Sequence, residues 1–132
     1  MMPATGVVAV GTVSQVVDGD TIKVRFTREV AIRIADCWAP EKKRTDHHSE
    51  KPRGIAARDA MELLADGERV RVVVRTDGDE DFGDSLTFGR VVADVYRESD
   101  GKNLAKGMIQ KGHAFRTKAE LEAFLEQKDA EQ

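Results

Sequence analysis

The chain has 132 residues, of which 40% are hydrophobic and 34% are charged, and its formal net charge at pH 7 is -3. This length allows one hydrophobic core but not two, so we predict a single domain over residues 1–132. The nearly balanced charge excludes a global electrostatic attraction to nucleic acid, although a local basic patch could still bind it. The lone cysteine, Cys37, excludes an internal disulfide framework and provides no zinc site.

The sequence contains no apolar run that approaches the length of a membrane span. Its first stretch, MMPATGVVAVGTV, lacks the basic start and the long apolar core of a signal peptide. We therefore expect a cytoplasmic protein with no membrane association, unless an export signal was removed from the sequence.

Three strands are predicted near the start of the chain. Alternating, valine-rich sequence predicts the first, Asp18-Gly19 marks a turn, and the stretch TIKVRF resumes as the second. The three predicted strands cover residues 7–17, 21–26 and 30–36. The next stretch, EKKRTDHHSEKPRG, is polar and is interrupted by Pro52 and Gly54, so we predict an exposed loop.

A helix is predicted for the stretch IAARDAMELLADG, which ends at Gly67. Its apolar face is predicted to carry Ile55, Ala56, Met61, Leu63 and Leu64. Two strands follow in the stretches ERVRVVVRT and FGRVVADVY, joined by an acidic loop at residues 77–85.

Two more helices are predicted after these strands. The stretch NLAKGMIQKG predicts a short one, and residues 117–129 predict an amphipathic one around Leu121, Phe124 and Leu125. Residues 126–132 are expected to be a frayed tail. Three strands, a helix, two strands and then helices are typical of a small barrel. We therefore predict an α+β fold, a five-stranded OB-fold Greek-key barrel with three helices packed outside.

Several charged residues have both an ordinary and a functional interpretation. Asp-Gly-Asp at 18–20 is common turn material. Arg33 lies within a strand, where a guanidinium must reach solvent or meet a partner. Glu41 could be a loop charge, and Arg90 after Gly89 could be a surface arginine or lie beside a ligand. No single residue decides between these interpretations, but their order along the chain is informative.

From about Val13 to about Phe115, the chain resembles the staphylococcal nuclease (thermonuclease) family. The resemblance rests on four features in order, which are VVDGDTIKV, Arg33 followed by Glu41 in APE, FGR at 88–90, and NLAKGMIQKGHA. That family has an OB-fold barrel with three helices and uses Ca²⁺ to cleave DNA and RNA phosphodiesters. The resemblance therefore implies a metal-dependent nuclease that acts on DNA and/or RNA with little sequence specificity, and we expect a monomer.

The resemblance also implies roles for individual residues. Arg33 and Arg90 resemble the two catalytic arginines, and Glu41 resembles the glutamate beside the attacking water. Fixed guanidinium groups stabilise the negative charge that develops on the phosphoryl oxygens, and a carboxylate can orient the water or accept its proton. Asp20 resembles the aspartate that binds Ca²⁺ directly, and Ala39 stands where a backbone carbonyl is the next ligand.

Trp38 is the departure from the family pattern. The pattern has a second metal-binding aspartate at this position, as in DAPE or DTPE, whereas this chain has WAPE. Loss of one carboxylate predicts weaker Ca²⁺ binding, and Asp36 could partly compensate if the strand is regular. Trp38 could be a hydrophobic plug at the barrel mouth or an aromatic platform for a nucleobase.

A basic cluster follows the predicted site and is a candidate for binding the substrate backbone. The cluster comprises Lys42, Lys43, Arg44, Lys51 and Arg53. Phe88 is a second candidate substrate contact, with a place in the core as the alternative. The adjacent histidines at 47 and 48 point in different directions and make a poor metal chelate.

The sequence thus predicts a nuclease, with one rival of another class. The rival is an OB-fold module that binds nucleic acid but whose catalysis is weak or lost because Trp38 replaces the second metal aspartate. The combination of Arg33, Glu41 and Arg90 favours the enzyme, because a binding module needs no glutamate beside its phosphates.

Overall fold

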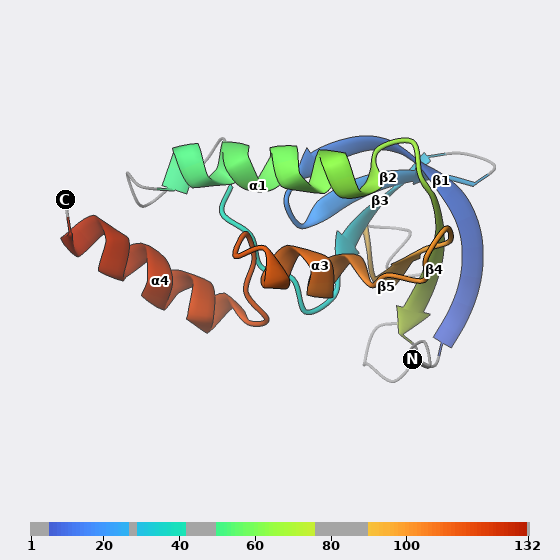
Figure 1. Cartoon of the computed structure of the whole chain (residues 1–132). Helices are drawn as coiled ribbons and strands as arrows, with labels where there is room; N and C mark the ends of the chain where they lie inside the picture. Colours follow the sequence, from blue (N-terminus) through green and yellow to red (C-terminus); the bar gives the residue numbers. More distant parts are fainter. Residues whose placement is uncertain (1–5, 27–28, 42–49, 76–89, 132) are drawn as a thin grey trace.

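The computed structural model describes residues 6–26, 29–41, 50–75 and 90–131. Five strands close into a barrel in the order β1-β2-β3-β5-β4 (Figure 1). The strands are β1 Gly6–Asp18, β2 Thr21–Arg25, β3 Glu29–Ile34, β4 Arg69–Arg75 and β5 Arg90–Arg97. All neighbouring pairs are antiparallel except β3 and β5, which run parallel. The mixed five-stranded barrel confirms the predicted OB-fold.

The barrel is filled by every second side chain of its strands. Because side chains alternate across a strand, one set points inward, and this set is mostly β-branched. Its members include Val13, Val16, Ile22, Val24, Ile32, Ile34, Val70, Val72, Val91 and Val95. These residues are almost completely buried. Their alternation with more exposed residues is the pattern from which the strands were predicted.

Strand β1 closes the barrel because its two ends pair with different neighbours. Its first half pairs with β4 and its second half with β2, and Thr12 has a partner in each. The strand passes close to its neighbours at Gly11, where an added Cβ would lie 2.6 Å from the carbonyl oxygen of Arg25. Glycine is therefore needed where β1 passes from its pairing with β4 to its pairing with β2.

Three helices occur in the described part of the chain, and they are α1 Glu50–Ala65, α3 Leu104–Gln110 and α4 Lys118–Ala130. Helix α1 contacts β1 and α3, and α3 also contacts β5. Figure 1 shows α4 extending away from the barrel, with the C-terminus at its far end. None of these helices has the length and apolar run that a membrane crossing requires.

The structure corrects the predicted bounds and face of the first helix. Helix α1 begins at Glu50, inside the predicted loop, because Pro52 lies in its first turn, where a missing N–H costs no hydrogen bond. Ile55 and Leu63 are 46% and 85% exposed, and Ala56 is exposed as well. Met61 and Leu64 are buried as predicted, and the buried face is completed by small residues, which are Gly54, Ala57, Ala60 and Ala65. Small residues were overlooked because periodicity weighs large apolar side chains most heavily.

Two further elements differ from the predictions. Strand β3 ends at Ile34, two residues early, because Asp36 adopts a positive φ of 55° in the turn that follows. Helix α4 continues through Ala130, so residues 126–130 are helical where a frayed tail was expected. Thr117 begins this helix by accepting a hydrogen bond from the backbone N–H of Glu120 at 3.2 Å.

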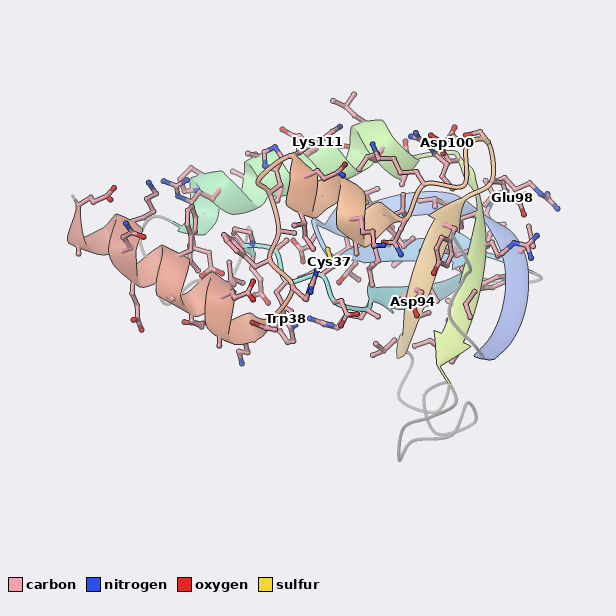
Figure 2. The ribbon with its side chains drawn as sticks, turned by 60° about the horizontal axis from the view of Figure 1, so that its bottom comes forward. Cys37, Trp38, Asp94, Glu98, Asp100 and Lys111 are labelled. Atoms are coloured by element: carbon pink, nitrogen blue, oxygen red, sulfur yellow. The ribbon has the colours of Figure 1, made fainter. Side chains whose placement is uncertain are left out.

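Cys37 lies in the interior (Figure 2). Its thiol contacts the carbonyl oxygen of Gly19 at 3.9 Å. Burial, and to a smaller extent the nearby carboxylate of Asp20, raise the pKa of Cys37 to about 12. The thiol is therefore protonated at neutral pH and does not act as a nucleophile.

Candidate functional site

The site begins at the turn between β1 and β2. One carboxylate oxygen of Asp20 accepts a hydrogen bond from the hydroxyl of Thr21 at 2.9 Å, and the other accepts one from the backbone N–H of Ala39 at 3.2 Å. The structure thus brings together the two residues predicted to bind a metal. Their side-by-side placement depends on the barrel, because Asp20 precedes β2 and Ala39 follows β3.

Gly19 allows this close approach. A Cβ at Gly19 would lie 2.8 Å from the Cβ atoms of both Ala39 and Ala57, closer than real side chains come. The glycine of the Asp-Gly-Asp stretch is therefore required by packing against the Ala39 segment and against α1. This packing fixes the distance between the Asp20 turn and the corner after β3.

Arg33 lies near the end of β3, paired with Thr21 of β2 and with Val92 of β5. Its guanidinium carbon is 3.7 Å from the centroid of the Trp38 ring. The Nη2 atom is buried and has no hydrogen-bond partner. No residue in the described ranges forms a hydrogen bond or an ion pair with this guanidinium. Arg33 is thus held by an aromatic ring and keeps its donors for another group.

Trp38 is held in place by its backbone. Its N–H donates to the carbonyl oxygen of Phe115 at 2.7 Å, and the N–H of Phe115 donates to the Trp38 carbonyl at 2.9 Å. The half-buried ring contacts Arg33 and lies 5.9 Å from the ammonium nitrogen of Lys118. Trp38 was predicted to be either a hydrophobic plug or a platform for a nucleobase, and neither hypothesis included a contact with Arg33. An arginine and a tryptophan five residues apart could have suggested it, but only once the turn between them was known.

Glu41 lies at the tip of the corner and is exposed. Its backbone N–H donates to the carboxylate of Glu50 at 3.1 Å, and Glu50 is buried at the first position of α1. Sequence reasoning missed Glu50 because it fell within the predicted loop. The hydrogen bond joins the chain before residue 42 to the helix after residue 49, and it fixes the backbone of Glu41.

The remaining predicted site residues are described only in part. Arg90 is the first residue of β5 and pairs with Ala31, which lies two residues before Arg33 on β3. The structure describes the backbone of Arg90 but not its side chain. Lys42, Lys43, Arg44 and Phe88 also lie outside the described residues. Of the other two basic residues, Lys51 is exposed, whereas the guanidinium of Arg53 lies 5.0 Å from the ring of Phe124.

A cluster of metal-binding side chains is not found within the described ranges, where no three His, Cys, Asp or Glu residues gather. The proposed help from Asp36 required a regular strand up to that residue. The strand ends at Ile34, and Asp36 is exposed in the turn, so that requirement is not met. Both predicted metal ligands, Asp20 and Ala39, lie within the described ranges.

The closed five-stranded barrel defines an OB-fold protein, in which the arginine of β3 lies against Trp38 at the corner that follows the strand. A family model described as staphylococcal nuclease homologue matches residues 31–132. Because the match covers most of the chain, the protein belongs to the staphylococcal nuclease homologue family, which confirms the resemblance. A search of the curated proteins finds no match.

Proposed function

We propose that the protein is a nuclease that hydrolyses phosphodiester bonds of DNA and/or RNA with little sequence specificity. Membership of the family supports a nuclease or a nucleic-acid-binding module. The observation that carries the proposal is the guanidinium of Arg33, which is stacked on Trp38 and has a buried, unpartnered nitrogen. A buried donor without an acceptor costs free energy, and a phosphate oxygen would remove that cost.

Arg33 suits the transition state of phosphodiester cleavage better than a surface arginine would. Its guanidinium remains charged at any physiological pH, and the Trp38 ring limits the positions that it can adopt. Negative charge that develops on the phosphoryl oxygens would therefore meet a donor that is already oriented. Arg90 begins the neighbouring strand and is assigned the second such contact.

Glu41 is assigned the position beside the attacking water. Pro40 and the hydrogen bond from the Glu41 N–H to Glu50 hold its backbone, while the residue itself is exposed to solvent. A carboxylate placed in this way can orient a water molecule or accept its proton. The buried Glu50 is assigned the role of a positioning residue, because it acts on the reaction through Glu41.

A divalent ion is part of the proposal, with Asp20 and the Ala39 carbonyl as its ligands and Ca²⁺ as the expected ion. When bound, such an ion would neutralise phosphate charge and lower the pKa of a bound water. One carboxylate and one carbonyl are few ligands for Ca²⁺, which takes six to eight oxygens, whereas Mg²⁺ keeps several waters and uses one or two carboxylates. The donor set therefore fits a weakly held ion with much of its water retained, and Mg²⁺ or Mn²⁺ could replace Ca²⁺.

The rival function is a module that binds nucleic acid with weak or no catalysis. Trp38 favours this rival, because it stands where the family pattern has a carboxylate and contributes no metal ligand. Both functions use Arg33 to bind a phosphate, so they differ in cleavage and not in binding.

A cleavage assay separates the two functions. Single-stranded DNA, duplex DNA and RNA would each be incubated with Ca²⁺, Mg²⁺, Mn²⁺ or a chelator. The matched variants are Arg33→Ala and Arg71→Ala, since Arg71 is an exposed arginine whose partner is Glu98. We expect metal-dependent cleavage that falls about a hundredfold in Arg33→Ala and is unchanged in Arg71→Ala. Binding without cleavage under every ion would favour the rival, and neither binding nor cleavage would overturn both.

A further inference from the structure

The Trp38 ring is close to two cations from different parts of the chain. Arg33 comes from β3 and lies 3.7 Å from the ring centroid, and Lys118 is the first residue of α4 and lies 5.9 Å from it. The cationic centres therefore cannot be farther apart than these two distances combined. Two cations at such a spacing can contact neighbouring phosphates of one polynucleotide strand, which are separated by a single sugar.

Backbone hydrogen bonds place Lys118 beside the ring. The two bonds between Trp38 and Phe115, at 2.7 and 2.9 Å, tie the segment before α4 to the corner of the site. Thr117 then starts the helix, so the direction of α4 is set from its first residue. The position of Lys118 is thus built by the fold, although its side chain is exposed.

The charges of Arg33 and Lys118 are not neutralised by a carboxylate of the described residues, in contrast to those of five other basic residues. Arg25, Arg58, Arg71, Arg97 and Lys128 each lie within ion-pair distance of a carboxylate. In the described ranges, neither Arg33 nor Lys118 has such a partner. The aromatic ring offsets part of the repulsion between these like charges, and an anionic ligand would offset the rest.

We propose that Lys118 binds a second phosphate of the substrate strand, adjacent to the phosphate at Arg33, with the Trp38 ring between the two contacts. This inference rests on the proposed function, because it assumes a phosphate at Arg33. It specifies the ligand as a polynucleotide strand, since a mononucleotide offers no second backbone phosphate. Lys118 is a binding residue here and takes no part in the chemistry.

Intrinsic fluorescence can test this inference, because Trp38 is the only tryptophan of the chain. The wild type, Lys118→Gln and Lys111→Gln would be titrated with a twelve-nucleotide thymidine oligonucleotide and with thymidine monophosphate. A chelator would prevent cleavage, and the titrations would be repeated over a range of salt concentrations. Lys111→Gln is the matched control, since Lys111 is exposed and lies on the opposite side of α3 from Trp38 (Figure 2).

We expect Lys118→Gln to lower the slope of log affinity against log salt by about 0.7 for the oligonucleotide, which is the effect of one phosphate contact on a single strand. At 0.1 M salt this corresponds to roughly a fivefold loss of affinity. Binding of the mononucleotide should not change, and the control should match the wild type for both ligands. A slope for Lys118→Gln equal to that of the control would overturn the inference and leave the proposed function standing. Absence of oligonucleotide binding by the wild type would overturn both.

Discussion

The guanidinium carbon of Arg33 lies 3.7 Å from the centroid of the Trp38 ring, at the corner where β3 leads to Pro40 and Glu41. An aspartate at position 38, as in the family pattern, would offer a carboxylate to a metal. Tryptophan offers a π-face, which attracts the arginine and cannot bind a hard cation as a carboxylate does. Trp38 therefore supports Arg33 and offers no carboxylate to a metal.

Arg33→Lys tests whether the planar guanidinium is needed. Lysine keeps the charge but has no fork of donors and stacks less well on an indole. We expect cleavage by Arg33→Lys to remain at least about tenfold slower than that of the wild type, although the charge is kept. Single-turnover rates would measure this effect. A rate equal to that of the wild type would show that charge alone is sufficient.

Trp38→Asp tests the lost metal ligand. The variant should bind Ca²⁺ more tightly, because a second carboxylate would join Asp20 near the Ala39 carbonyl. It should also be less stable by about 1–3 kcal/mol, through loss of apolar burial and of the contact with Arg33. Calorimetric titration with Ca²⁺ and thermal unfolding would measure both effects on the folded variant. Trp38→Leu is the control for stability, since it removes the ring without adding a carboxylate. Equal Ca²⁺ affinity in the wild type and in folded Trp38→Asp would place any metal site elsewhere.

Glu50→Ala tests the positioning of Glu41. The change removes the acceptor of the Glu41 N–H, so we expect a loss of about 1–3 kcal/mol in the free energy of unfolding and slower cleavage. Glu50→Gln keeps an acceptor oxygen and should recover most of the rate. As a control, Glu62→Ala removes an ion pair of α1 with Arg58, which should cost no more than about 1 kcal/mol. Cleavage by Glu50→Ala at the wild-type rate would argue against the positioning role.

Gly19→Ala tests the packing that sets the Asp20 turn against Ala39. The new methyl group would lie 2.8 Å from the Cβ atoms of Ala39 and Ala57, so one of the segments must move. We expect a loss of about 1–3 kcal/mol in stability, as overpacking commonly causes. Urea unfolding would measure it, with Gly54→Ala as a comparison within α1. Unchanged stability would show that the segments around Ala39 and Ala57 can move to accept the methyl group at little cost in free energy.

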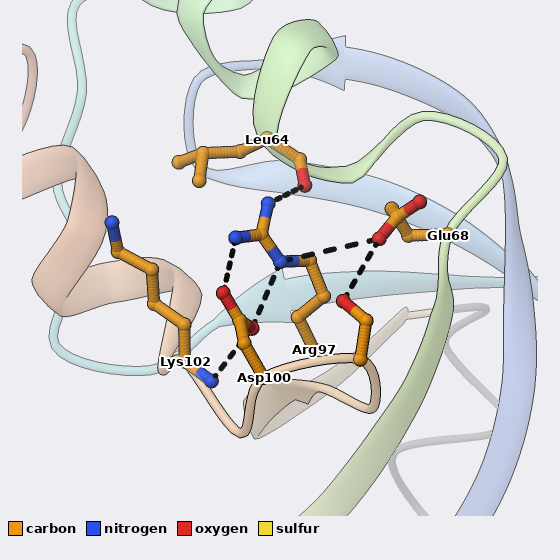
Figure 3. Close-up of polar contacts among 6 residues, drawn as sticks. Leu64, Glu68, Arg97, Asp100 and Lys102 are labelled. Atoms are coloured by element: carbon orange, nitrogen blue, oxygen red, sulfur yellow. Dashed lines mark hydrogen bonds and ion pairs between the residues drawn. The ribbon is translucent and has the colours of Figure 1, made fainter.

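Asp100 provides a pH-dependent prediction outside the site. Its carboxylate accepts hydrogen bonds from the guanidinium of Arg97 and from the backbone N–H of Lys102, and Arg97 also donates to the Leu64 carbonyl (Figure 3). The bond with Arg97 is the main cause that lowers the pKa of Asp100 from 3.8 to about 2. Because this pKa is lowered, the ionised carboxylate of Asp100 stabilises the folded state. Its contribution is complete above pH 3.8 and is lost as the pH falls towards 2.

Asp100→Asn measures that contribution. The free energy of unfolding of the wild type should exceed that of the variant at pH 6, and the difference should shrink between pH 4 and pH 2. Urea unfolding at several pH values would show the trend. A difference that is the same at pH 6 and pH 2 would mean that the carboxylate charge of Asp100 is not its source.

The strands and the order of the site residues could be predicted from the sequence. Inward-facing β-branched residues recur at every second position, and this period is a local property of the chain. Asp20, Arg33 and Glu41 stand near the ends of those strands, and the family resemblance implied that they share one site. The family match confirmed the fold that this pattern indicated.

The contacts that give the site its particular character required the tertiary structure. Trp38 pairs with Phe115 and lies near Lys118, and both of these residues are remote from it in sequence. The start of α1 and its buried alanines were also missed, because small residues give a weak periodic signal and their burial depends on what packs against them. Local periodicity thus determined the strands, whereas long-range packing decided which side chain supports Arg33.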